Sequence, residues 1–107
     1  MAISELVPAD LQRRLAAGED LVVVDVREAE ELAICSLEGA LHVPLSEFSV
    51  RHTELDPDRA AVLVCHHGIR SAHACLALEQ LGFDTLYNLA GGIDRWAAEL
   101  DPTMARY

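Results

Sequence analysis

The residues with the clearest chemical potential lie together in the segment 65–71, which reads CHHGIRS. A continuous apolar run typical of a buried strand precedes it at 60–64, and a helical pattern follows it at 72–81. Cys65 is therefore predicted where a strand leads into a helix N-terminus, whose unpaired N–H groups and partial positive charge stabilise a thiolate. The spacing from Cys65 to Arg70 predicts a nucleophilic cysteine in a loop that binds anions.

The other residues of this loop have roles that follow from their types. Gly68 lets the backbone turn with its amides pointing inward, so the N–H groups of 66–71, including that of Ile69, can surround an anion. Arg70 either holds the loop or binds an anionic leaving group, the alternative being a solvated surface arginine. Ser71 is predicted to cap the following helix, or else to donate a hydrogen bond within the loop.

The two histidines of the loop leave two interpretations open. His66 and His67 either bind a substrate anion when protonated, or face solvent. Together with His73 and Cys75 they could suggest a metal site, but their spacing matches no structural zinc pattern. We therefore predict neither a metal nor another cofactor.

Residues outside the loop are interpreted mainly as structural. Asp25 and Arg27 follow a predicted strand and could support the site. An ion pair or cap is favoured over a catalytic carboxylate there, because an ionised thiol needs no general base. Cys35 and Cys75 are predicted to pack in the interior, with a disulfide to Cys65 under oxidation as the alternative.

Strands and helices are predicted to alternate along the chain. Strands are expected at 3–6, 21–24, 40–43, 61–64 and 85–88, and helices at 9–17, 27–33, 46–51, 72–81 and 93–100. This alternation predicts an α/β fold with a mostly parallel sheet. Ligands bind beyond the carboxyl ends of parallel strands, so Asp25, Pro44, Cys65 and the turn at 91–92 should share one rim of the sheet.

Composition narrows the function classes. The 107 residues fit one domain, 1–107, and no apolar run reaches the ~18–20 residues of a membrane span. The net charge is −10 and every basic residue is an arginine, so we expect neither nucleic acid nor a membrane as a partner. Three cysteines without paired spacing, and no signal-peptide pattern, predict a reducing, cytoplasmic location.

Four segments in this order resemble the rhodanese superfamily of sulfurtransferases, over nearly the whole chain. They are 24–28 (VDVRE), 38–45 (EGALHVPL), the loop 65–71, and 89–92 (LAGG) followed by Trp96. The resemblance is closest to single-domain rhodaneses and to rhodanese domains of sulfur-activating enzymes. It implies five parallel strands flanked by helices on both faces, and a persulfide on Cys65 as the working intermediate. The Gly-His-Ile common before Gly-Ala in the family reads 35–37 (CSL) here, so that histidine is absent.

The reaction that this resemblance implies has two halves. The Cys65 thiolate attacks the outer sulfur of thiosulfate and sulfite leaves, after which cyanide or a thiol takes the sulfur from the persulfide. The implied partners are a small anionic sulfur donor, a thiol or cyanide acceptor, and, among proteins, a sulfur donor or a thioredoxin-like protein.

Two alternatives stay open at this point. A persulfide relay module, which takes sulfur from a protein partner, would use the same residues. A phosphatase is disfavoured, because arsenate reductases and tyrosine phosphatases use Cys-x5-Arg loops. The spacing from Cys65 to Arg70 is Cys-x4-Arg, which makes a smaller cradle suited to a sulfur atom.

Overall fold

The computed structural model describes residues 3–107 and contains one five-stranded sheet in the order β1-β5-β4-β2-β3. Every strand pair in it is parallel. The strands are β1 (Ile3–Leu6), β2 (Leu21–Asp25), β3 (Leu41–His42), β4 (Ala60–Val64) and β5 (Leu86–Leu89). The predicted α/β fold is confirmed. Strand β3 is shorter than predicted because Ala40 belongs to a turn, with its N–H bonded to the carbonyl of Leu37.

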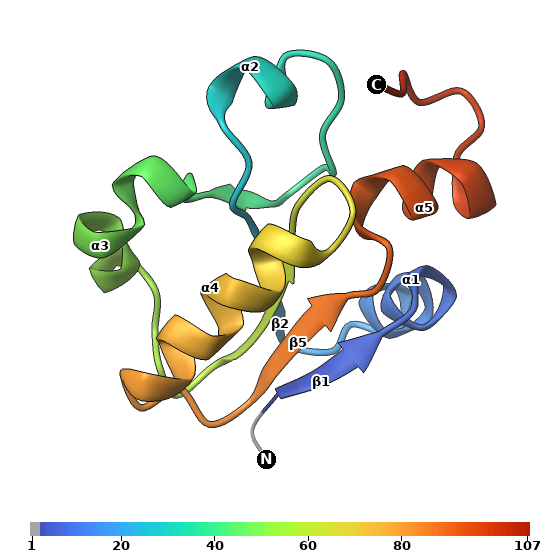
Figure 1. Cartoon of the computed structure of the whole chain (residues 1–107). Helices are drawn as coiled ribbons and strands as arrows, with labels where there is room; N and C mark the ends of the chain where they lie inside the picture. Colours follow the sequence, from blue (N-terminus) through green and yellow to red (C-terminus); the bar gives the residue numbers. More distant parts are fainter. Residues whose placement is uncertain (1–2) are drawn as a thin grey trace.

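Helices cover both faces of the sheet (Figure 1). Helix α4 (Ile69–Gln80) and the short α3 (Phe48–Arg51) pack on one face, and α1 (Pro8–Ala16) and α5 (Gly92–Leu100) pack on the other. The remaining elements are α2 (Ala29–Leu32) and the two 3-10 turns η1 (Leu45–Glu47) and η2 (His52–Glu54). Within residues 3–107, no helix has the length and apolar character needed to cross a bilayer.

The alternation of side chains along β4 divides the core into two clusters. Ala61 and Leu63 join the cluster beneath α4, whereas Val62 and Val64 join the cluster beneath α1 and α5. Both faces are covered, which explains why this strand is a continuous apolar run. Cys65 follows the strand directly and belongs to the cluster on the α4 side.

A buried ion pair fixes the chain where β2 ends. The Arg27 guanidinium, which is 0 % exposed, donates to the two carboxylate oxygens of Asp25 at 2.8, 3.0 and 3.1 Å. It also donates to the carbonyl of Cys35 at 2.8 Å and to the hydroxyl of Tyr107 at 3.0 Å. Burial alone would lower the pKa of Arg27, but the hydrogen bonds to Asp25 and Tyr107 raise it. Arg27 thus ties the sheet to the chain around α2 and to the C-terminal segment.

We predict that Arg27→Met lowers the free energy of unfolding by about 3–5 kcal/mol, because it leaves the Asp25 carboxylate charged and unpaired in the interior. Urea denaturation followed by circular dichroism measures this change. Arg13→Met is the matched control. It removes an arginine from the exposed pair with Asp10 and should leave the unfolding midpoint near that of the wild type. Equal midpoints for the two variants would contradict a structural role of the buried pair.

Candidate active site

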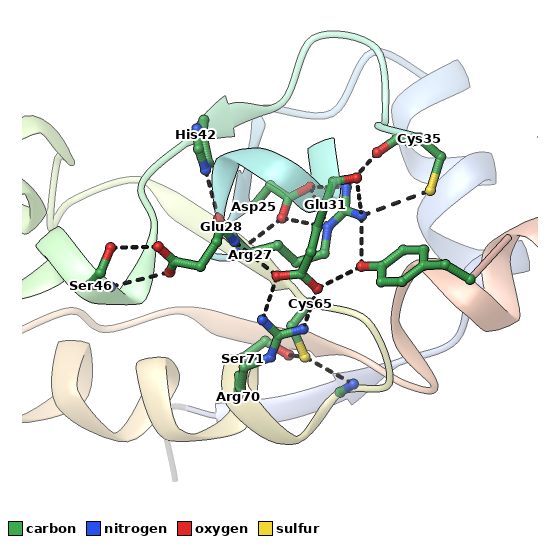
Figure 2. A network of polar contacts seen from close by, with 12 residues as sticks. Asp25, Arg27, Glu28, Glu31, Cys35, His42, Ser46, Cys65, Arg70 and Ser71 are labelled. Carbon is green, nitrogen blue, oxygen red and sulfur yellow. Dashed lines mark hydrogen bonds and ion pairs between the residues drawn. The ribbon is translucent and has the colours of Figure 1, made fainter. Parts of the chain in front are cut away.

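Cys65 lies at the bottom of the loop that joins β4 to α4. Its side chain is buried, with 1 % of the residue exposed. The Gly68 N–H donates to the sulfur at 3.0 Å, and the Ser71 hydroxyl lies 3.2 Å from it (Figure 2). The Gly68 N–H therefore donates to the sulfur, which stabilises a negative charge on it, and the Ser71 hydroxyl oxygen is in contact with the same atom.

Helix α4 begins at Ile69, three residues before the predicted start, and this changes the role of Ser71. Gly68 occupies the N-cap position with φ 99°, and the helix has no side-chain cap. Ser71 is therefore not the helix cap. It lies in the first turn, where its buried hydroxyl is 3.2 Å from the sulfur and donates to the side-chain oxygen of Asn88. A Cβ at Gly68 would lie 3.3 Å from the carbonyl oxygen of Leu89, so both the positive φ and the close approach favour glycine there.

The N-terminus of α5 binds the outer side of the loop. The Ile93 N–H donates to the carbonyl of Cys65 at 2.9 Å, and the Asp94 N–H donates to the carbonyl of His66 at 3.1 Å. These are among the N–H groups that a helix start leaves unpaired. A Cβ at Gly92 would come within 2.5 Å of the Cys65 carbonyl oxygen, so glycine allows this close contact. The turn at 91–92 thus lies beside Cys65, as the rim of a parallel sheet requires.

Asn88, on β5, connects three parts of the site. Its side-chain N–H groups donate to the carbonyl of Gly68 at 3.0 Å and to the carboxylate of Glu5 at 3.0 and 3.3 Å. Its side-chain oxygen accepts from the Ser71 hydroxyl at 2.5 Å. Only 3 % of Asn88 is exposed. The amide therefore holds both the turn at Gly68 and the hydroxyl that faces Cys65.

Arg70 points to α2 (Figure 2). Its two terminal nitrogens donate to the two carboxylate oxygens of Glu31, each at 2.7 Å. The hydrogen bonds from Arg70 lower the pKa of Glu31 to about 2, and the hydroxyl of Tyr107 donates to the same carboxylate at 2.7 Å. Glu31 is therefore ionised at neutral pH, and Arg70 links the loop to α2.

His66 and His67 lie in an aromatic stack with Tyr107. The ring of His66 is parallel to that of Tyr107, with centroids 3.8 Å apart, and its other neighbour is the ring of His67 at 3.9 Å. His67 Nε2 lies 3.7 Å from the carboxylate of Asp94. Arg106 donates to both oxygens of Asp94, at 3.0 and 3.2 Å, and lowers its pKa.

In residues 3–107, one set of His, Cys and acidic side chains has the proximity of metal ligands. Ligand atoms of His66, His67 and Asp94 lie within 4.8 Å of one another. The set does not include His73 or Cys75, so the four-residue cluster considered from the sequence does not form. Arg106 already binds the carboxylate of this set, which opposes a cation there.

An open pocket of about 260 Å³ gives access to the loop, lined by Cys65, His66, His67, Ile69 and Arg70. The Ile69 residue is 69 % exposed at its rim. Cys35 and Cys75 lie outside this lining. Cys75 is buried beneath β5 with its sulfur 3.6 Å from the carbonyl of Tyr87, and burial raises the pKa of its thiol to about 12.

The structure adds three residues that the sequence analysis did not connect with the site: Glu31, Asn88 and Tyr107. Asn88 carried a signal, since a polar residue at the end of a predicted buried strand requires hydrogen-bond partners. Glu31 was one of several acidic residues in its segment, with nothing in the sequence to pair it with Arg70. The position of Tyr107 depends on the path of the chain after α5, which turns back toward α2 (Figure 1).

Comparison with known proteins extends these observations. The rhodanese-like domain model matches residues 7–99. The chain is 35% identical to the putative sulfurtransferase YtwF of Bacillus subtilis, covering 95% of this chain and 98% of that protein. It is 37% identical to a sulfurtransferase of Allochromatium vinosum, with 96% of each covered.

The fold is also similar to that of solved structures. A rhodanese-related protein from Thermoplasma volcanium superposes with a TM-score of 0.81 at 33% identity, covering 90% of this chain and 92% of that one. Sequence and fold agree over almost the full length, and the chain belongs to the rhodanese-like family.

Proposed function

We propose that this chain is a sulfurtransferase that carries sulfane sulfur as a persulfide on Cys65. The observation that carries the proposal is the Gly68 N–H that donates to the Cys65 sulfur, with the Ser71 hydroxyl in contact with the same atom, at the bottom of an open pocket. Membership of the rhodanese-like family supports it, as do the sulfurtransferase names of the relatives.

The first half of the proposed reaction loads the cysteine. The Cys65 thiolate attacks the outer sulfur of thiosulfate or a related donor, and a new S–S bond forms. The S–S bond of the donor breaks, and its electron pair leaves with sulfite. In the second half, cyanide or a thiolate attacks the outer sulfur of the persulfide, and the Cys65 thiolate is released as the leaving group. Charge balances in both halves, and no oxidant or reductant is required.

The residues around the sulfur have different roles in this reaction. The Gly68 N–H stabilises charge on the Cys65 sulfur, and inward-facing N–H groups of the loop bind the outer sulfur. His66 and His67 line the pocket and contact the donor as it binds. Arg70 holds the loop against α2 through Glu31. The Asp25–Arg27 pair stabilises the chain segment that leads from β2 into α2.

The alternatives to this reaction are a persulfide relay and a phosphatase. A relay that receives sulfur from a protein persulfide would use the same cysteine and loop, with a thiol-bearing protein as donor or acceptor. A phosphatase is disfavoured, because the Arg70 guanidinium engages Glu31 and leaves the loop without a cation above the sulfur.

Cys35, Cys65 and Cys75 are all free thiols, which supports a reducing, cytoplasmic setting.

Incubation with thiosulfate should add about 32 Da to the protein, located on Cys65, because one sulfur atom is retained between the two halves of the reaction. Intact-protein and peptide mass spectrometry measure the adduct. Cys65→Ser should abolish both the adduct and thiocyanate formation, whereas Cys35→Ser should retain them. If neither thiosulfate nor a persulfide donor gives an adduct on Cys65, the proposal is wrong.

Asn88→Ala should lower kcat for sulfur transfer by about tenfold with a small change in KM, because the Gly68 turn and the Ser71 hydroxyl each lose a buried partner. Ser71→Ala interrupts the same chain of hydrogen bonds nearer the sulfur. The double variant should therefore be no slower than the slower single variant. Steady-state kinetics on the three variants measure this coupling. Strictly additive effects, or a change confined to KM, would show that Asn88 does not act through Ser71.

A further inference from the structure

The charges at the mouth of the pocket are neutralised by partners built into the fold. Of the five residues that line the pocket, Arg70 alone carries a permanent charge. Both of its terminal nitrogens are bound by Glu31, which is only 19 % exposed in its side chain. Because the carboxylate and the guanidinium face each other at 2.7 Å, the pair has no net charge to offer to a ligand.

The second group of charges at the mouth is compensated in the same way. Asp94 pairs with Arg106 and lies 3.7 Å from His67 Nε2. The charges of Arg70, Glu31, Asp94 and Arg106 sum to zero. The whole chain carries −10.

A doubly charged donor therefore meets no uncompensated cation as it approaches Cys65. The group that stabilises negative charge at the bottom of the pocket is the Gly68 N–H, which acts over a short distance on one sulfur atom. The rim offers the exposed apolar side chain of Ile69, which suits an organic substituent better than a sulfonate. Both features favour an organosulfur donor of low charge.

We propose that Glu31 is a specificity-determining residue, which neutralises Arg70 and so selects alkyl persulfides over dianionic donors such as thiosulfate. The proposal rests on the proposed function at Cys65 and specifies its donor. In the favoured step, the Cys65 thiolate attacks the terminal sulfur of R–S–SH. The Cys65–S–SH bond forms, the donor S–S bond breaks, and R–S⁻ leaves with the electron pair.

The test compares a dianionic donor, thiosulfate, with two monoanionic donors, methanethiosulfonate and an alkyl persulfide prepared in situ. Glu31→Gln keeps the shape of the side chain and an oxygen that accepts hydrogen bonds, but it leaves the Arg70 charge uncompensated. Coulomb energy scales with donor charge, so kcat/KM should rise about tenfold for the thiosulfate dianion but only about threefold for methanethiosulfonate and the alkyl persulfide, which are monoanions at neutral pH. High salt should abolish these gains.

Two controls isolate the charge of Glu31. Glu30→Gln makes the same change of charge at an exposed neighbour on the same helix, and the ratio of kcat/KM values between donors should stay as in the wild type. Tyr107→Phe removes the hydroxyl that binds Glu31 without a change of charge, and it should likewise leave the donor ratio unchanged. Thermal unfolding of each variant reports whether the fold is retained.

A measurement on the wild type gives an independent result should Glu31→Gln fail to fold. A neutralised mouth on an acidic protein predicts that kcat/KM for thiosulfate stays constant or rises with ionic strength, and a steep fall would overturn the proposal. If Glu31→Gln raises kcat/KM equally for all three donors, or for none, the selectivity proposal is overturned. The proposed persulfide on Cys65 is unaffected by that result. Absence of a Cys65 adduct with every donor would instead overturn the proposed function itself.

Discussion

The active-site loop can present N–H groups on its inner side, as Gly68 does to the Cys65 sulfur, only because its carbonyl oxygens are bound elsewhere. A peptide unit carries its N–H and its C=O in opposite directions, so turning donors inward turns acceptors outward, where burial would leave them unpaired. The structure supplies an external donor for three of them. The N-terminus of α5 binds the carbonyls of Cys65 and His66, and the Asn88 amide binds that of Gly68.

This constraint explains why elements far apart in the sequence meet at the loop. Strand β5 must lie beside β4 to bring Asn88 under the turn, and α5 must begin immediately after it to place its free N–H groups. Gly92 allows the backbone of α5 to come close enough, since a side chain there would collide with the Cys65 carbonyl. On the opposite side, the Arg70–Glu31 contact joins the loop to α2, a helix of four residues. Such a short helix depends on side-chain contacts rather than on helix propensity.

The elements that carry a strong apolar pattern were predictable from the sequence, and the polar contacts of the site were largely not. Strands β2 and β4 are buried on both faces, so burial alone determines their composition. The predicted start of α4 was wrong because the N-cap residue is Gly68, which has a left-handed backbone conformation. A glycine gives no side-chain signal of the kind that a capping serine or aspartate gives. The Arg70–Glu31 pair joins residues 39 positions apart, and only the folded chain shows which of several acidic residues in that segment reaches the arginine.

The loop thus combines two kinds of electrostatic stabilisation with different ranges. The hydrogen-bond donor at the bottom acts on the sulfur atom in contact with it and favours a charge concentrated there, as in a thiolate or a persulfide. Ion pairs at the mouth cancel the longer-ranged field that would attract a charged donor from solution. A site with this arrangement stabilises its own intermediate without concentrating anions at its entrance. Since the chemistry at the sulfur is the same for every donor, the mouth is where this chain can discriminate among donors, and Glu31 is the residue whose charge sets the field there.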